Sequence, residues 1–138
     1  MSASIPQIVY GKFLIFIDAA ASSDGIKVTL SQDGVPPDNF AIEFQHTPDR
    51  IVLHHGSVTN WGSLEWSTAH PYFVWFVYNQ GAGTASMWLA ASDVKPADPD
   101  VTVTGGNGAN TSDVISLQTK ANDKFFFDDL KLSTSTFE

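Results

Sequence analysis

Two neighbouring segments of the sequence place planar polar side chains in alternation with apolar ones, and two tryptophans follow. Glu43 and Gln45 belong to the first segment and His54 to the second, while Trp61 and Trp66 lie just downstream. Carboxylate, amide and imidazole groups exchange hydrogen bonds with sugar hydroxyls, and an indole offers an apolar surface on which a pyranose ring stacks. We therefore expect a carbohydrate-binding surface made of Glu43, Gln45, His54, Trp61 and Trp66.

Two β-strands with one buried face are predicted to carry the three polar residues. Apolar and polar residues alternate over 40–45 and again over 50–55, which is the period of a half-buried strand. The intervening His-Thr-Pro-Asp favours a turn. Pairing Gln45 with Arg50 is the register that keeps each face of one kind. The predicted core face carries Phe40, Ile42, Phe44, Ile51, Leu53 and His55, and the opposite face carries Glu43, Gln45, Arg50 and His54.

An acidic pair near the C-terminus, Asp128 and Asp129, is a candidate metal site. It lies within a strand predicted over 125–132, so alternation places one carboxylate on the core side. An ionised carboxylate there needs a cation or hydrogen bonds. An oxygen-ligated Ca²⁺ would satisfy it, so a structural calcium ion at Asp128 and Asp129 is allowed, although no cofactor is required. The four histidines lack the spacing of a zinc site.

The sequence does not predict an enzyme. Glycoside hydrolysis needs two carboxylates facing one groove, and Glu43 with Glu65 is the one candidate pair that the motifs offer. No nucleophile elbow is present to start a Ser-His-Asp site. We therefore expect binding without catalysis.

The remaining segments predict an all-β fold. No helical periodicity survives over ten residues, and short apolar segments are separated by Gly- and Pro-containing turns. This pattern predicts an antiparallel two-sheet β-sandwich or jelly roll, with residues 1–138 as a single domain. Strands are expected at 7–18 (with Gly11 as a break), 26–31, 40–45, 50–55, 71–79, 84–91, 101–103, 114–117 and 125–132, with loops at 32–38, 56–63 and 92–112.

A second pair of tryptophans is predicted on another hairpin. Pairing Asn79 with Thr84 places Trp75 directly opposite Trp88 on one face. Such a pair forms either a covered aromatic cluster or a stacking platform. Large aromatics on a central strand commonly serve packing, which favours the covered cluster.

Composition excludes several classes of partner. The formal net charge is −8, and the seven basic residues are scattered singly, so neither nucleic acid nor an anionic membrane is an expected partner. No apolar run approaches the length of a membrane span, so membrane insertion is not expected. The segment Met-Ser-Ala-Ser-Ile-Pro shows no signal peptide, and there is no cysteine. The localisation is left open between cytoplasmic and extracellular.

The segment 39–66 resembles the galectin branch of the concanavalin A-like lectins. The matching stretches are Gly-Lys-Phe-Leu-Ile at 11–15, Ile-Lys-Val-Thr-Leu at 26–30, Ala-Ile-Glu-Phe-Gln at 41–45, Ile-Val-Leu-His at 51–54 and Trp-Gly-Ser-Leu-Glu-Trp at 61–66. The resemblance implies a jelly-roll sandwich in which Trp61 stacks on a sugar. Glu43, Gln45 and His54 replace the family's histidine and two asparagines, so β-galactoside specificity is not implied.

Two further resemblances cover other stretches of the chain. Phe-Ile-Asp-Ala at 16–19 and the strand beginning at Phe73 resemble the all-β domain named after farnesoic acid methyltransferase. The ending at 125–132 resembles the last strand of jelly-roll carbohydrate-binding modules, in which an acidic residue often holds calcium. All three resemblances imply a β-sandwich.

The leading prediction is therefore a non-catalytic lectin or carbohydrate-binding module whose partner is a glycan or polysaccharide. The alternative is a structural or self-associating β-sandwich, such as an adhesin or assembly subunit. In that case the exposed aromatics would form a protein interface, and the chain would be a homo-oligomer.

Overall fold

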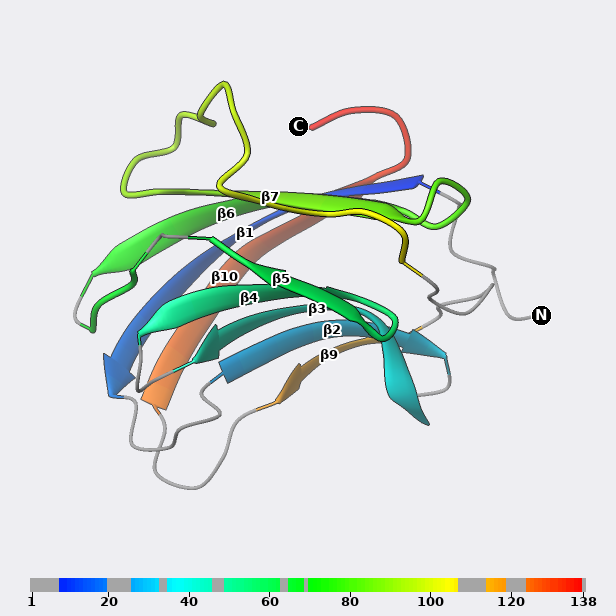
Figure 1. The fold of residues 1–138 in the computed structure, drawn as a ribbon. Helices are drawn as coiled ribbons and strands as arrows, with labels where there is room; N and C mark the ends of the chain where they lie inside the picture. Colours follow the sequence, from blue (N-terminus) through cyan, green and yellow to red (C-terminus); the bar gives the residue numbers. More distant parts are fainter. Residues whose placement is uncertain are drawn as a thin grey trace.

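Two antiparallel five-stranded sheets pack face to face (Figure 1). The computed structural model describes residues 8–19, 26–32, 35–45, 49–62, 65–68, 70–106, 114–118 and 124–137. The strands are β1 (Ile8–Ala19), β2 (Ile26–Gln32), β3 (Val35–Gln45), β4 (Arg50–His55), β5 (Val58–Trp61), β6 (Pro71–Asn79), β7 (Thr84–Ala90), β8 (Val101–Val103), β9 (Val114–Gln118) and β10 (Lys124–Ser133).

The strand order separates the chain into two layers. One sheet has the order β10-β1-β6-β7-β8 and the other the order β5-β4-β3-β2-β9. The described residues contain no helix, and thus none that is long and apolar enough to cross a membrane. The all-β sandwich predicted from the sequence is confirmed.

The predicted register of the central hairpin is confirmed. Gln45 pairs with Arg50, and Phe44 pairs with Ile51. Because side chains alternate along each strand, this pairing sends the apolar set of β3 and β4 into the space between the sheets. The core formed there includes Phe13, Ile15, Ile17, Ile26, Val28, Leu30, Phe40, Ile42, Phe44, Ile51, Leu53, Val74, Phe76, Tyr78 and Met87.

His55 faces this core, as predicted, and is fully buried. Its ring lies 4.8 Å from the ring of Tyr78, and its Nε2 is 3.3 Å from the carbonyl oxygen of Asn79. A Cβ added at Gly106 would lie 2.2 Å from the imidazole, so the absence of a side chain there makes room for the ring. Burial raises the pKa of Tyr78 to about 12.

Three boundaries differ from the prediction. Gly11 does not break β1, which runs through it and pairs with β6 and β10. Strand β3 begins at Val35, inside the segment predicted as a loop, and its two prolines fall in an irregularity of the pairing with β2. Proline is tolerated at such a bulge because no ladder hydrogen bond is lost. Strand β5 lies within the segment predicted as a loop at 56–63. The prediction missed it because an exposed polar edge strand has the same composition as a loop.

The outer face of the β10-β1-β6-β7-β8 sheet carries the second tryptophan pair. Trp75 and Trp88 pair directly and are both buried, so they form the covered cluster favoured by the sequence. Lys12 lies over Trp75, and Lys95 lies over Trp88. The C-terminal residues curl back over this sheet (Figure 1). Phe137 contacts the ring of Trp88 edge-on.

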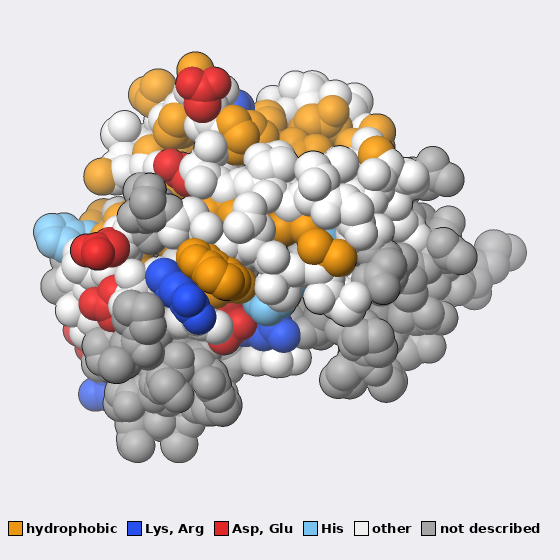
Figure 2. Space-filling model, in the orientation of Figure 1, with side chains coloured by type: hydrophobic (Ala, Val, Ile, Leu, Met, Phe, Trp, Pro, Cys, Tyr) orange, Lys and Arg blue, Asp and Glu red, His pale blue; other side chains and the backbone are white. Residues whose placement is uncertain are grey.

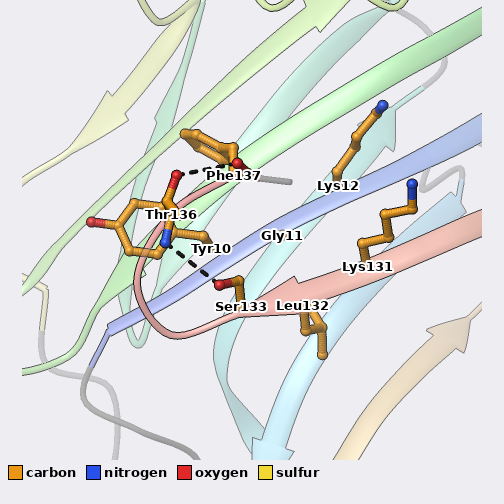
Figure 3. A pocket seen from close by; sticks show the side chains of 8 residues that line it. All are labelled: Tyr10, Gly11, Lys12, Lys131, Leu132, Ser133, Thr136 and Phe137. Carbon is orange, nitrogen blue, oxygen red and sulfur yellow. Dashed lines mark hydrogen bonds between the residues drawn. The ribbon is translucent and has the colours of Figure 1, made fainter.

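A small pocket lies between this C-terminal segment and β1. Thr136 N donates to Ser133 Oγ, and Thr136 Oγ1 donates to the carbonyl oxygen of Phe137, so the segment is held by its own hydrogen bonds (Figure 3). The pocket is lined by Tyr10, Gly11, Lys12, Lys131, Leu132, Ser133, Thr136 and Phe137.

Candidate functional site

The outer side of the β5-β4-β3-β2-β9 sheet is a surface that we call the polar face. Its members alternate with core residues along each strand, and the pairing brings them into rows across the sheet. One row runs through Gln118, Lys27, Glu43, Val52 and Trp61. The described members are Lys27, Thr29, Ala41, Glu43, Gln45, Arg50, Val52, His54, Thr59, Trp61, Ser116 and Gln118.

Four side chains of the polar face form one chain of hydrogen bonds. His54 Nε2 lies 3.0 Å from Glu43 Oε2, and Gln45 Nε2 donates to Glu43 Oε1 at 3.1 Å. Arg50 Nε then donates to Gln45 Oε1 at 2.7 Å. The structure therefore brings together three of the residues that the sequence singled out, and it adds Arg50.

Glu43 is the one carboxylate among the described strand side chains of the polar face. Burial alone would raise its pKa, but hydrogen bonds from His54 and Gln45, together with the charges of His54 and Lys27, outweigh burial and hold the pKa of Glu43 below its ordinary value. Glu43 is thus an ionised acceptor at neutral pH. Both of its oxygens are engaged by neighbouring side chains.

Trp61 stands at the edge of the polar face with 56% of its surface exposed. Its backbone N–H donates to its neighbour Asn60 at Oδ1, and Asn60 Nδ2 donates to the carbonyl oxygen of Thr102 on β8. This second bond ties β5 to the other sheet. The guanidinium carbon of Arg50 lies 5.0 Å from the centroid of the Trp61 ring, within the range of a cation–π contact.

Val52 lies beneath these side chains. It points to the polar face between Glu43 and Trp61, yet only 3% of its surface is exposed. Neighbouring side chains therefore close over it and give this end of the face an apolar floor. Figure 2 shows basic, acidic, histidine and hydrophobic side chains meeting on the face that is turned toward the viewer.

The other end of the polar face is less accessible. Thr29 and Ala41 belong to it by register but are fully buried, and Thr29 Oγ1 lies 2.5 Å from Ser116 Oγ. Beside this buried pair, the linked polar side chains and the exposed indole gather around Glu43, Arg50 and Trp61. This end of the face, on β3, β4 and β5, is the candidate site.

The placement predicted for Trp66 is wrong. Only 2% of its surface is exposed, and its ring meets Phe44 edge-on in the core. Its Nε1 donates to the carbonyl oxygen of Gln45 at 2.8 Å, which satisfies the indole N–H inside the sandwich. The Gly and Ser residues before Trp66 give no sign that its side chain is buried, so alternation and composition could not separate it from Trp61.

The prediction that one of Asp128 and Asp129 lies on the core side is also wrong, because both are exposed. The pairing of β10 with β1 shifts at this point, and Asp129 has a positive φ of 53°, so simple alternation fails. Asp128 Oδ1 accepts from the backbone N–H of Asp129, and Lys131 Nζ lies 3.6 Å from Asp129 Oδ1.

Among the described residues, the two carboxylates have no further acidic or histidine side chain with which to hold a calcium ion. Ca²⁺ takes 6–8 oxygen ligands. Across the parts of the chain that the structure describes, no group of three or more His, Asp or Glu residues could hold a metal.

No model of a known protein family and no curated protein matches the sequence. Solved structures do match the fold. The metal-free exoplasmic/lumenal domain of VIP36 superposes with a TM-score of 0.72 at 12% identity, over 98% of this chain and 72% of that one. Sheep galectin-11 in complex with glycerol matches with a TM-score of 0.58 at 9% identity, over 96% and 95% of the two chains.

A third structural match is the catalytic domain of a glycoside hydrolase of family 131 from Coprinopsis cinerea. It has a TM-score of 0.59 at 11% identity, over 94% of this chain and 57% of that one. At such identities these likenesses establish the fold alone. The chain has the jelly-roll β-sandwich of galectins, which confirms the fold predicted from its sequence, and that fold also carries a hydrolase.

Proposed function

We propose that this chain is a non-catalytic carbohydrate-binding domain and that its site is the β3-β4-β5 end of the polar face. The observation that carries the proposal is the position of Trp61. A large exposed indole stands beside a hydrogen-bonded chain of His54, Glu43, Gln45 and Arg50. A sugar needs an apolar surface for one ring face and fixed polar groups for its hydroxyls, and both are present within one row of side chains.

In this proposal Trp61 stacks on the sugar with the part of its ring that Arg50 leaves uncovered. Glu43 accepts from hydroxyls with its remaining lone pairs, since a carboxylate has about four acceptor sites. His54 and Gln45 hold the carboxylate in place and offer further groups at the rim. The printed names of the structural neighbours support the ligand class, because VIP36 was solved in a Ca²⁺/Man-bound form and galectin-11 with glycerol.

The absence of catalysis is proposed from the state of Glu43. A glycosidase pairs a nucleophile or base with a carboxylic acid whose pKa is raised. The pKa of Glu43 is lowered instead, and no second carboxylate stands beside it among the described strand side chains of the polar face. Glu65 is exposed and lies outside those strands. This arrangement suits hydrogen bonding to a sugar better than proton transfer.

The test is affinity electrophoresis on a panel of neutral and acidic polysaccharides, followed by calorimetry with the oligosaccharides that bind. Trp61→Ala should weaken binding at least tenfold, about the contribution of one stacked aromatic ring. Phe126→Ala is the matched control, since Phe126 is an aromatic residue of the opposite sheet with 68% of its surface exposed. Failure of the wild-type protein to bind any saccharide would refute the proposal.

Self-association is a second candidate function, favoured by one observation. Edge strand β10 exposes Phe126, Leu130 and Leu132, an apolar set that could join two copies. Light scattering decides between the candidates. An oligomer that Phe126→Ser dissociates and Trp61→Ala leaves intact supports association through β10, whereas a monomer at all concentrations excludes it.

A further inference from the structure

Arg50 carries two terminal NH₂ groups that no residue of the described chain engages. Its Nε donates to Gln45 Oε1, and the flat guanidinium lies over Trp61, but neither contact uses Nη1 or Nη2. The guanidinium has five N–H donors in a fixed plane. With Nε occupied, the pair of parallel N–H bonds at its outer edge is available to a ligand.

The orientation of this guanidinium is fixed by its neighbours. Gln45 Oε1 is held toward Arg50 because Gln45 Nε2 donates to Glu43, and Glu43 is held in turn by His54. On the other side, the indole of Trp61 supports the guanidinium plane. A side chain ordered in this way loses little conformational freedom when a ligand binds.

On the described strands of the polar face, the side chains carry a net charge opposite in sign to that of the whole chain. The chain has fifteen acidic and seven basic residues, for a net charge of −8. Among the described strand side chains of the polar face there are two cations, Lys27 and Arg50, and one carboxylate, Glu43. Lys27 pairs with Glu43 in register and contributes to lowering its pKa. Within the part of the chain that the structure describes, Arg50 therefore remains a cation without a carboxylate partner.

We infer that the site selects an acidic saccharide, a sugar that carries a carboxylate as uronic acids do; this inference rests on the carbohydrate-binding function proposed above. The carboxylate accepts two parallel hydrogen bonds from Nη1 and Nη2 of Arg50, while the sugar ring lies along the exposed part of Trp61. Two parallel charge-assisted bonds match the fork of a guanidinium, whereas a hydroxyl of a neutral sugar offers one oxygen. Arg50 is thus the residue that sets specificity.

The experiment compares saccharides that differ only in the carboxylate. Tetrasaccharides of glucuronic, galacturonic and mannuronic acid are titrated by calorimetry at low ionic strength, each beside its carboxyl-reduced counterpart. For at least one pair the acidic member should bind roughly tenfold tighter or more, since each charge-assisted bond exceeds a neutral one. Added salt should reduce this preference, because the site is partly exposed.

Two variants test whether the preference for the acidic saccharide depends on the two terminal NH₂ groups of Arg50. Arg50→Gln should abolish it, and Arg50→Lys should reduce it, because lysine keeps the charge without the planar pair of donors. Lys131→Gln, on the other sheet, removes one positive charge away from the site and should keep the wild-type preference. Thermal unfolding confirms that each variant is folded, and Arg50→Lys provides the test on its own if Arg50→Gln does not fold.

The outcomes separate this inference from the proposed function. If acidic and reduced members bind equally, or if Arg50→Gln retains the preference, the inference is overturned while carbohydrate binding stands. If no saccharide of either kind binds, the proposed function fails and the inference fails with it.

Discussion

The guanidinium of Arg50 lies over the indole of Trp61, with 5.0 Å between its central carbon and the ring centroid. The contact links β4 to the edge strand β5 on the polar face. It also joins Trp61, the large exposed aromatic among the described residues of this face, to the hydrogen-bonded chain that ends at Glu43 and His54. The apolar and polar halves of the candidate site are thereby held in one fixed arrangement.

This relationship predicts energetic coupling between Arg50 and Trp61. A cation–π contact at an exposed site contributes about 0.5–1 kcal/mol. A double-mutant cycle with Arg50→Ala and Trp61→Ala, measured by urea denaturation, should therefore give a coupling free energy of about 0.5–1 kcal/mol. Trp61→Ala alone should cost about 1 kcal/mol or less, because the side chain is mostly exposed. A coupling energy of zero would mean that the two groups do not hold each other in solution.

Replacing Trp66 should affect stability far more than replacing Trp61, although the two tryptophans are only five positions apart in the sequence. The side chain of Trp66 fills the core against Phe44, so Trp66→Ala should reduce the free energy of unfolding by about 3–5 kcal/mol. Trp66→Phe should cost less, but it removes the donor to the carbonyl oxygen of Gln45 and should still destabilise by about 1–3 kcal/mol. Urea denaturation measures both. A Trp66→Ala protein with near wild-type stability would show that Trp66 lies on the surface.

The contrast between these tryptophans marks how far the sequence could predict the site. Period-two alternation determined the pairing of Gln45 with Arg50, and with it the positions of Glu43 and His54. Alternation predicts no side-chain placement beyond the end of the regular strand. Nothing in the composition of the segment before Trp66 indicates that its side chain is buried, because its burial depends on contacts with Phe44 and Gln45, which are distant in sequence.

The other differences between the sequence-based predictions and the structure also have local causes. Alternation also failed at Asp128 and Asp129, where a bulge with a positive φ shifts the parity of β10. The role of Arg50 depends on side-chain rotamers, since its pairing partner was predictable but its position over Trp61 was not. The sequence could therefore predict strands and faces, but not which side chains on a face touch one another.

The charge state of Glu43 predicts how stability depends on pH. Its pKa is lower in the folded protein than in the unfolded chain, so ionised Glu43 stabilises the fold above the unfolded pKa of about 4.5. That contribution is lost as the pH falls through the folded pKa. Glu43→Gln should therefore be less stable than wild type at pH 7, and the difference should shrink below about pH 4.5. Thermal melts from pH 7 to pH 3 test this, and a difference that grows on acidification would contradict it.

Replacing Asp93 should lower the free energy of unfolding, whereas replacing Lys12 should not. Lys12 is buried on β1, pairs with Asp93, and lies 5.6 and 5.7 Å from the ring centroids of Phe73 and Trp75. Asp93→Asn leaves a buried ammonium without its carboxylate and should cost about 1–3 kcal/mol, a reduced penalty because Asp93 itself is half exposed. Lys12→Met removes the charge while keeping an unbranched stem against the aromatic rings, so it should be neutral or stabilising. Urea denaturation at pH 7 compares the two, and equal costs would show that the pair acts as an ordinary surface ion pair.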